Sequence, residues 1–177
     1  MKKILLILGV FLLLVGCQNK ENNNDSIVSN ESKTVIYTLN NTNEDIDMYS
    51  KEDIKIPIVN TVKIEYTSNI ALKIIEKIES DYSEATDKYV NESYEQNKTN
   101  FVEDYNKHKG FTMNIEQKDK SILINGEYDL ASVNSSEVKN YLELSFGLDP
   151  ENYNEDGTYP LDDLEKALEE KGFTKEA

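Results

Sequence analysis

The chain has 177 residues, 19 of them basic and 34 acidic, which gives a formal net charge of −15. All the basic residues are lysines, so the paired guanidinium donors that favour phosphate and guanine recognition are absent, and the charge opposes contact with a phosphate backbone. Composition therefore excludes nucleic-acid binding, while a 38% hydrophobic content is enough for one domain with a modest core.

The N-terminal segment has the pattern of a targeting leader. Lysines at 2–3 precede an apolar run at 4–15, which is too short to cross the ~30 Å hydrocarbon core of a membrane as a helix. The run ends in Leu-Val-Gly-Cys at 14–17, which resembles the lipobox of bacterial lipoproteins. By that resemblance the chain is cut between Gly16 and Cys17, and Cys17 carries the lipid. The alternative is an ordinary secretory signal or a short hydrophobic helix that happens to precede a cysteine.

The leader defines three parts of the chain. Residues 1–16 are the expected signal peptide, and 17–33 are the expected lipidated cysteine and flexible tether, because 18–33 contains almost no apolar residues. The folded domain is expected over 34–177. Two or more acyl chains anchor a protein stably. Because the leader resembles that of bacterial lipoproteins, we expect the anchored domain on the extracytoplasmic face of the cell membrane.

Alternating apolar residues open the domain and predict strands. Residues 35–39 alternate, the Asn-rich stretch 40–43 is typical of a turn, and a second strand is expected around Ile46 and Met48. Alternation returns at 54–58 and again at 62–66. This half of the domain is therefore predicted to form antiparallel hairpins.

From Ile70 the apolar spacing fits a helical stripe. The stripe consists of Ile70, Ile74, Ile75, Ile78, Tyr82, Ala85 and Tyr89. Lys73, Glu76, Lys77 and Glu84 lie opposite it. This spacing predicts an amphipathic helix packed on the sheet. Periodicity is lost over 91–100, and a short helical turn is expected at 101–105 before a left-handed cap at Gly110.

The last third of the chain predicts a hairpin and two helices. Residues 111–115 and 122–130 alternate on either side of a turn at 118–120. Asn134 and Glu137 have capping-box spacing before one helix, although Ser or Thr is preferred in the first position. Pro160 begins the terminal helix and Gly172 ends it. The predicted fold class is α+β, an antiparallel sheet built from hairpins and packed by an amphipathic helix and a C-terminal helix.

Several of these features together resemble the YehR-like family of small bacterial lipoproteins. They are the lipobox at Cys17, the strands at 61–66 and 122–129, the spacing Tyr105-x-x-x-x-Gly110-Phe111, and the helix end at 164–173. The resemblance implies an α+β domain with an antiparallel sheet. It implies no activity and supplies no catalytic residues, and the stretch 83–100 is longer than the family pattern.

Catalytic candidates are few. The single histidine, His108, lies in a polar run with lysines on both sides, so we expect a solvent-facing residue before a turn instead of a catalytic base. One histidine and one lipidated cysteine leave too few ligands for zinc or copper. Carboxylates are too abundant for any pair to be chosen as acid and base. We therefore predict no catalytic residue.

One stretch imitates a calcium loop. Asn152, Asn154, Asp156 and Asp163 occupy loop positions 1, 3, 5 and 12, and Gly157 occupies position 6. Against a site, position 1 is Asn, the usual bidentate Glu is the shorter Asp163, and Pro160 occupies position 9. The alternatives are a weak Ca²⁺ site and an acidic surface loop, and we expect no other cofactor.

The chain has eleven tyrosines and no tryptophan. Tyr82, Tyr89, Tyr94 and Tyr105 lie close together in sequence, and tyrosine is enriched at interfaces. Packing at the core edge and a partner or glycan surface are both consistent with these residues. Ring exposure in the structure distinguishes them.

These observations favour a membrane-anchored extracytoplasmic lipoprotein that acts as a non-enzymatic interaction or binding module. It would contact the membrane through the lipid at Cys17, with an envelope protein as a possible partner. One alternative is a lipoprotein that binds calcium weakly or binds a small ligand. The other is a carboxylate-based hydrolase of the cell envelope.

Overall fold

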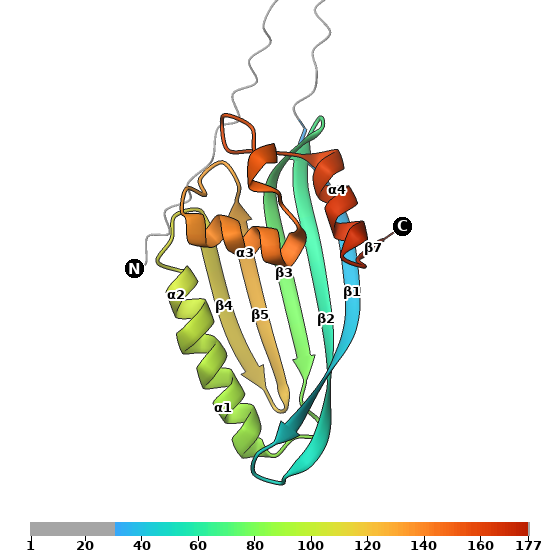
Figure 1. Cartoon of the computed structure of the whole chain (residues 1–177), viewed down its shortest axis with the longest axis vertical. Helices are drawn as coiled ribbons and strands as arrows, with labels where there is room; N and C mark the ends of the chain where they lie inside the picture. Colours follow the sequence, from blue (N-terminus) through green and yellow to red (C-terminus); the bar gives the residue numbers. More distant parts are fainter. Residues whose placement is uncertain (1–30, 177) are drawn as a thin grey trace, which may run out of the picture.

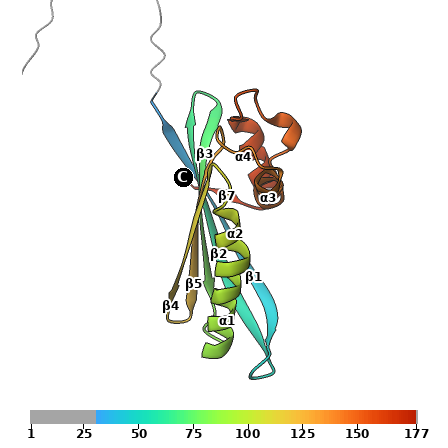
Figure 2. The ribbon, with the colours of Figure 1, turned by 90° about the vertical axis from the view of Figure 1, so that its left-hand side faces the viewer.

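The structure, a computed structural model, describes residues 31–176, so the signal peptide, Gly16, Cys17 and most of the tether lie outside the described residues. Seven strands form one antiparallel sheet in the order β4-β5-β3-β2-β1-β7, with β6 paired to β3. Helices lie against one face of this sheet (Figure 1, Figure 2). The predicted α+β class is confirmed.

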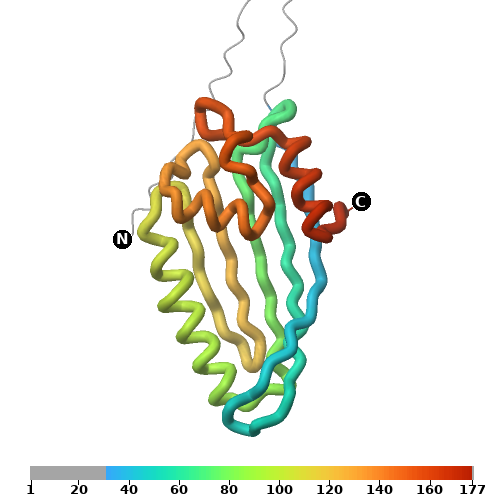
Figure 3. The backbone as a smooth tube through the Cα atoms, in the orientation of Figure 1, coloured from blue at the N-terminus to red at the C-terminus, as the bar shows by residue number. Residues whose placement is uncertain are grey.

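The first two strands are longer than predicted. β1 (Lys33–Asp47) pairs with β2 (Glu52–Thr67) along its whole length, from Lys33 opposite Tyr66 to Asp47 opposite Glu52. The turn predicted at 40–43 is therefore wrong, because these residues continue β1 and the chain reverses at 48–51. Polar residues are tolerated here because this part of β1 is the edge of the sheet. Figure 3 shows the hairpin end extending beyond the β4–β5 turn.

The helix predicted from Ile70 is also wrong. Residues Ile70–Asp81 form β3, which pairs with β2 on one side and β5 on the other. Ile74, Glu76 and Ile78 face the helices, whereas Ile75 and Lys77 alternate with them and face the opposite side. A strand placed between two others satisfies its backbone hydrogen bonds on both sides, and this tertiary pairing outweighs the local helical spacing.

The helical segment begins after β3. α1 (Asp87–Asn97) continues through a π-helical turn (Lys98–Val102) into α2 (Glu103–Tyr105). Thr86 caps α1 by accepting the Tyr89 amide at 3.3 Å. The turn predicted at 101–105 is thus the end of a longer helical rod. Its first half is α1, and from residue 91 onward α1 runs through the stretch where the sequence shows no periodicity.

The second hairpin is confirmed. β4 (Phe111–Lys118) and β5 (Ser121–Asp129) pair in regular register. Gly110 before β4 has φ +78°, and a side chain there would place its Cβ 2.8 Å from the Val133 nitrogen. On the outer edge of β4, the Asn106 side chain donates to the Met113 carbonyl at 2.7 Å and accepts the Met113 amide at 2.6 Å.

The C-terminal elements complete the covered face. α3 (Ser136–Phe146) is capped by Ser135, one residue after the predicted Asn134. A 3₁₀ turn (Pro150–Asn152), β6 (Tyr159–Pro160), α4 (Leu161–Glu170) and β7 (Thr174–Lys175) follow. The predicted end of the terminal helix is confirmed, since Gly172 has φ +91° and Phe173 is buried. No helix among residues 31–176 is long and apolar enough to cross a membrane.

The two faces of the sheet differ in chemistry. Toward the helices lie fully buried side chains such as Tyr37, Ile64, Ile74 and Tyr128, which pack with the apolar stripes of α3 and α4. On the opposite face, outward residues of β2, β3 and β5 form exposed ion pairs. These are Lys63–Glu65 at 3.2 Å, Lys73–Glu127 at 3.4 Å and Lys77–Glu79 at 3.2 Å. The core therefore lies on one side of the sheet only.

Candidate binding pocket at Glu76

A pocket of about 430 Å³ opens on the helical side of the sheet. Strands β1 to β3, the π-helical turn, α3 and the end of α4 contribute its walls. They supply Leu39, Asn60, Glu76, Ile78, Phe101, Tyr141, Ser145, Lys171 and Phe173. Most of these side chains are apolar or aromatic, so the few polar groups among them decide what the pocket can recognise.

Glu76 is the most unusual of these residues because its carboxyl group is buried. The residue is 2% exposed, although charged residues are almost never buried without a partner. Its Oε2 accepts hydrogen bonds from the hydroxyls of Tyr128 at 2.6 Å and Tyr141 at 2.8 Å. Its Oε1 accepts one from Asn60 Nδ2 at 2.7 Å. Three donors from β2, β5 and α3 thus hold one carboxyl group.

A glycine on the neighbouring strand makes room for this network. Gly126 of β5 pairs directly with Glu76 of β3. A Cβ atom at position 126 would overlap the Tyr128 hydroxyl, which crosses above the glycine to reach Glu76. The missing side chain therefore permits the contact between the tyrosine and the carboxyl group.

The electrostatic setting favours the neutral form of Glu76. Burial removes water from the carboxyl group and raises its pKa above the usual value, while the hydrogen bonds from Tyr128, Asn60 and Tyr141 act in the opposite direction without cancelling it. The pKa of the Tyr128 hydroxyl is also raised, chiefly by burial and then by the nearby carboxyl group. The tyrosines therefore remain protonated donors.

The pocket has more acceptors than donors to match them. None of the ion pairs among residues 31–176 involves Glu76, and the nearby Lys171 donates its Nζ to the Leu144 carbonyl at 2.7 Å. The Asn60 Oδ1 atom is buried and finds no hydrogen-bond partner in the described part of the chain. In its ionised form the Glu76 carboxyl group offers about four acceptor positions, and three are used. The pocket can therefore accept hydrogen bonds from a ligand.

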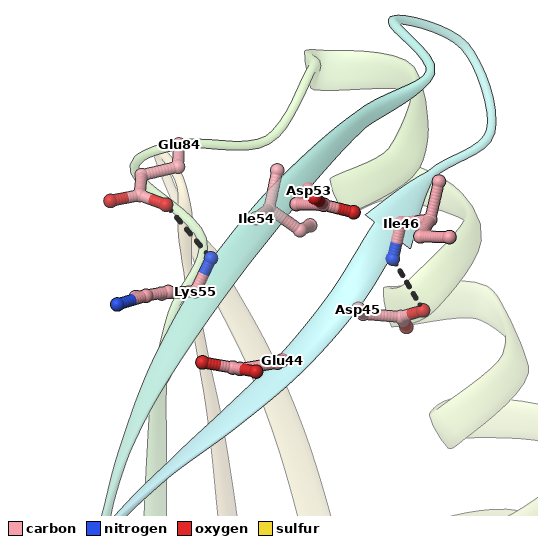
Figure 4. A pocket seen from close by; sticks show the side chains of 7 residues that line it. All are labelled: Glu44, Asp45, Ile46, Asp53, Ile54, Lys55 and Glu84. Atoms are coloured by element: carbon pink, nitrogen blue, oxygen red, sulfur yellow. Dashed lines mark hydrogen bonds between the residues drawn. The ribbon is translucent and has the colours of Figure 1, made fainter.

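A second hollow, of about 570 Å³, lies at the far end of the β1–β2 hairpin (Figure 4). It is lined by Glu44, Asp45, Ile46, Asp53, Ile54, Lys55 and Glu84. Figure 4 shows its carboxylates spread around the hollow. Glu84 accepts the Lys55 amide at 2.8 Å, and Asp45 accepts the Ile46 amide at 2.7 Å and the Tyr89 hydroxyl. These carboxylates hold the hairpin against the start of α1, which makes the hollow a weaker candidate.

The predicted calcium residues lie in and around the loop before α4. Asn152 ends the 3₁₀ turn, Asn154 and Asp156 lie in the loop, and Asp163 lies in the first turn of α4. Asp156 Oδ1 accepts the Thr158 hydroxyl at 2.6 Å and its amide at 3.0 Å, and these bonds lower the pKa of Asp156. Within residues 31–176 no three His, Cys, Asp or Glu residues are grouped to hold a metal. A site that also uses the two asparagines remains a prediction.

The remaining sequence candidates pack at the edge of the core. Tyr82, Tyr89, Tyr94 and Tyr105 are partly buried against the core, which confirms core-edge packing. His108 is partly exposed after the end of α2, and its ring centroid lies 6.3 Å from that of Tyr105. Sequence reasoning missed Glu76, which the helical interpretation placed on a solvated face.

Comparison with known proteins concerns the fold. No family model matches the chain, and no curated protein matches it. The NMR structure of a protein from Streptococcus pneumoniae TIGR4 has 14% identity and a TM-score of 0.47, covering 95% of this chain and 99% of that one. The NMR structure of the E. coli YehR protein has 11% identity and a TM-score of 0.53, covering 83% and 92%. The chain therefore has a fold like that of E. coli YehR.

Proposed function

We propose that this protein is a lipid-anchored extracytoplasmic binding module of the YehR-like lipoprotein family, and that it works without catalysis. The observation that carries the binding role is the Glu76 pocket, where a buried carboxyl group faces an open space. The anchoring role is supported by the sequence at 14–17, with Cys17 as the acylated residue.

The chemistry of the pocket favours binding over hydrolysis. Hydrolysis by carboxylates needs two such groups with opposed environments, one acting as acid and one as base or nucleophile. Among the described residues that line this pocket, Glu76 is the single carboxyl group. Its oxygens are held by tyrosine hydroxyls and an amide, which suits recognition of a ligand more than proton transfer to one.

The anchor is tested by metabolic labelling of cells with an alkyne analogue of palmitate. We expect the wild-type chain to be labelled and to sediment with membranes, and Cys17→Ser to lose both properties. Labelling of Cys17→Ser at the wild-type level would contradict the anchor.

The binding role is tested in the same cells by chemical crosslinking of the tagged protein, followed by mass spectrometry under denaturing conditions. We expect a reproducible envelope partner or ligand adduct that is lost in Cys17→Ser. Recovery of only abundant bystanders from both chains would contradict the role as an interaction module.

A further inference from the structure

We infer that the Glu76 pocket binds a small ligand that carries a protonated amine on an apolar body. This inference rests on the proposed binding function and specifies the ligand class. It follows from three features of the pocket: its unused acceptors, its uncompensated carboxyl group and its aromatic wall.

The acceptors define the hydrogen-bonding requirement. Glu76 Oε1 accepts only the bond from Asn60 Nδ2, and Asn60 Oδ1 is buried without a partner among residues 31–176. An unpaired buried acceptor costs free energy, so a ligand group that donates to it gains affinity. Both atoms belong to side chains in one wall of the pocket. A ligand group with several N–H donors therefore suits this wall, and an ammonium group has three.

The charge defines the sign of the ligand. Glu76 is buried with no ion-pair partner in the described part of the chain, and burial opposes its ionisation. A bound cation would supply the missing counter-charge and stabilise the carboxylate. The chain's net charge of −15 also raises the local concentration of cations over that of anions.

The aromatic wall defines the rest of the ligand. The Phe101 and Tyr141 rings lie with centroids 5.4 Å apart, and Leu39, Ile78 and Phe173 complete the apolar lining. Aromatic faces attract cations, and apolar side chains favour a hydrocarbon body. Lys171 is the one cation among the lining residues, and its Nζ donates a hydrogen bond to the Leu144 carbonyl.

The test is a titration of the processed, lipidated chain in detergent micelles with 2-phenylethylammonium. Its neutral counterpart, 2-phenylethanol, is titrated in parallel. Binding is followed through the methyl signals of isotope-labelled isoleucines. Ile78 lines the pocket, whereas Ile75 lies on the opposite face of the same strand and is the internal control. We expect the amine to shift the Ile78 signal and the alcohol to shift it far less.

Two substitutions should change the amine affinity in opposite directions. Glu76→Gln should weaken binding about tenfold or more, because a charged hydrogen bond is lost. Lys171→Gln should strengthen it about two- to fivefold, because a like charge near the pocket is removed. Glu79→Gln is the matched control, since Glu79 lies on β3 but faces the other side and should leave the affinity unchanged.

Three results would overturn the inference: no movement of Ile78 with the amine, equal binding of amine and alcohol, or equal binding by wild type and a folded Glu76→Gln. If Glu76→Gln fails to fold, Lys171→Gln still tests the inference. An affinity of Lys171→Gln for the amine that is weaker than or equal to that of wild type would contradict a cationic ligand. If a partner is crosslinked in cells but the titration is negative, this inference is refuted and the proposed function still stands. Loss of labelling and crosslinking would instead refute the proposed function.

Discussion

Charged side chains are buried on one face of the sheet and exposed on the other, and two consecutive residues of β3 show this difference. Glu76 points to the helices and is held by three neutral donors, whereas Lys77 points to the open face and pairs with Glu79 at 3.2 Å. Both residues of the Lys77–Glu79 pair are about half exposed, at 51% and 52%. Water can therefore solvate the pair, while Glu76 depends on protein groups or a ligand.

This difference indicates where function lies. Solvated ion pairs contribute little to stability or specificity, because water competes with each partner. A buried carboxyl group with no counter-ion costs free energy, and its retention beside a pocket is typical of a binding site. The covered face is thus both the core of the domain and the location of its candidate site.

The largest expected effect is a difference in stability loss between substitutions at two adjacent isoleucines of β3. Ile74 is fully buried beneath the helices, and Ile75 faces the open side. Ile74→Ala should lower the free energy of unfolding by about 2–5 kcal/mol because it leaves a cavity. Ile75→Ala should lower it by about 1 kcal/mol or less. Urea unfolding followed by circular dichroism measures both, and equal losses would contradict the assignment of faces.

A second effect concerns the space above Gly126. Gly126→Ala should destabilise the domain by about 1–3 kcal/mol, because the new methyl group displaces the Tyr128 hydroxyl from Glu76. Tyr128→Phe removes that hydroxyl. The double variant should therefore lose less stability than the sum of the single variants, as thermal and urea unfolding would reveal. Strict additivity would show that the glycine and the hydroxyl act independently.

A third effect is the pH dependence of stability. Because the pKa of Glu76 is raised in the folded state by burial, the neutral carboxyl group contributes stability that is fully present below its unfolded pKa. That contribution is lost as the pH rises through the folded pKa. Glu76→Gln cannot ionise, so it carries no such pH-dependent contribution. The free energy of unfolding of Glu76→Gln, relative to that of wild type, should therefore rise as the pH increases.

The measurement for this effect is a series of urea unfolding curves, for wild type and Glu76→Gln, from pH 4 to pH 8. The result that would refute the effect is a free-energy difference between the two proteins that stays constant across the series.

The smallest expected effect is on the open face. Lys77→Ala removes one half of a solvated ion pair and should change the free energy of unfolding by less than about 1 kcal/mol. The change should shrink further in high salt, because salt screens exposed charges. A loss comparable with that of Ile74→Ala would mean that this face is covered in solution.

Sequence predicted the fold class and the second half of the domain because there the local signals agree with the tertiary structure. The β4–β5 hairpin alternates cleanly, and the terminal helix has its proline, acidic first turn and final glycine in the usual places. After Gly172 the chain folds back, and the Phe173 amide donates to the Leu168 carbonyl at 3.0 Å.

Sequence failed at β3 for a reason connected with the candidate site. An inward glutamate at 76 and an outward isoleucine at 75 break the period-two pattern, so Ile70, Ile74, Ile75 and Ile78 fit a helical stripe instead. The network that buries Glu76 joins residues from β2, β3, β5 and α3, and no local pattern reports contacts between segments so distant. The buried charge therefore concealed both the strand and the pocket.

The side chain of Asn106 has a consequence for how copies of this protein meet. Its amide forms both hydrogen bonds that a neighbouring strand would form with Met113 of β4. A sheet edge with free N–H and C=O groups is a template for another chain. One asparagine thus takes the place of a pairing strand at Met113, so a second copy of the chain cannot pair with β4 at that position without displacing the Asn106 side chain.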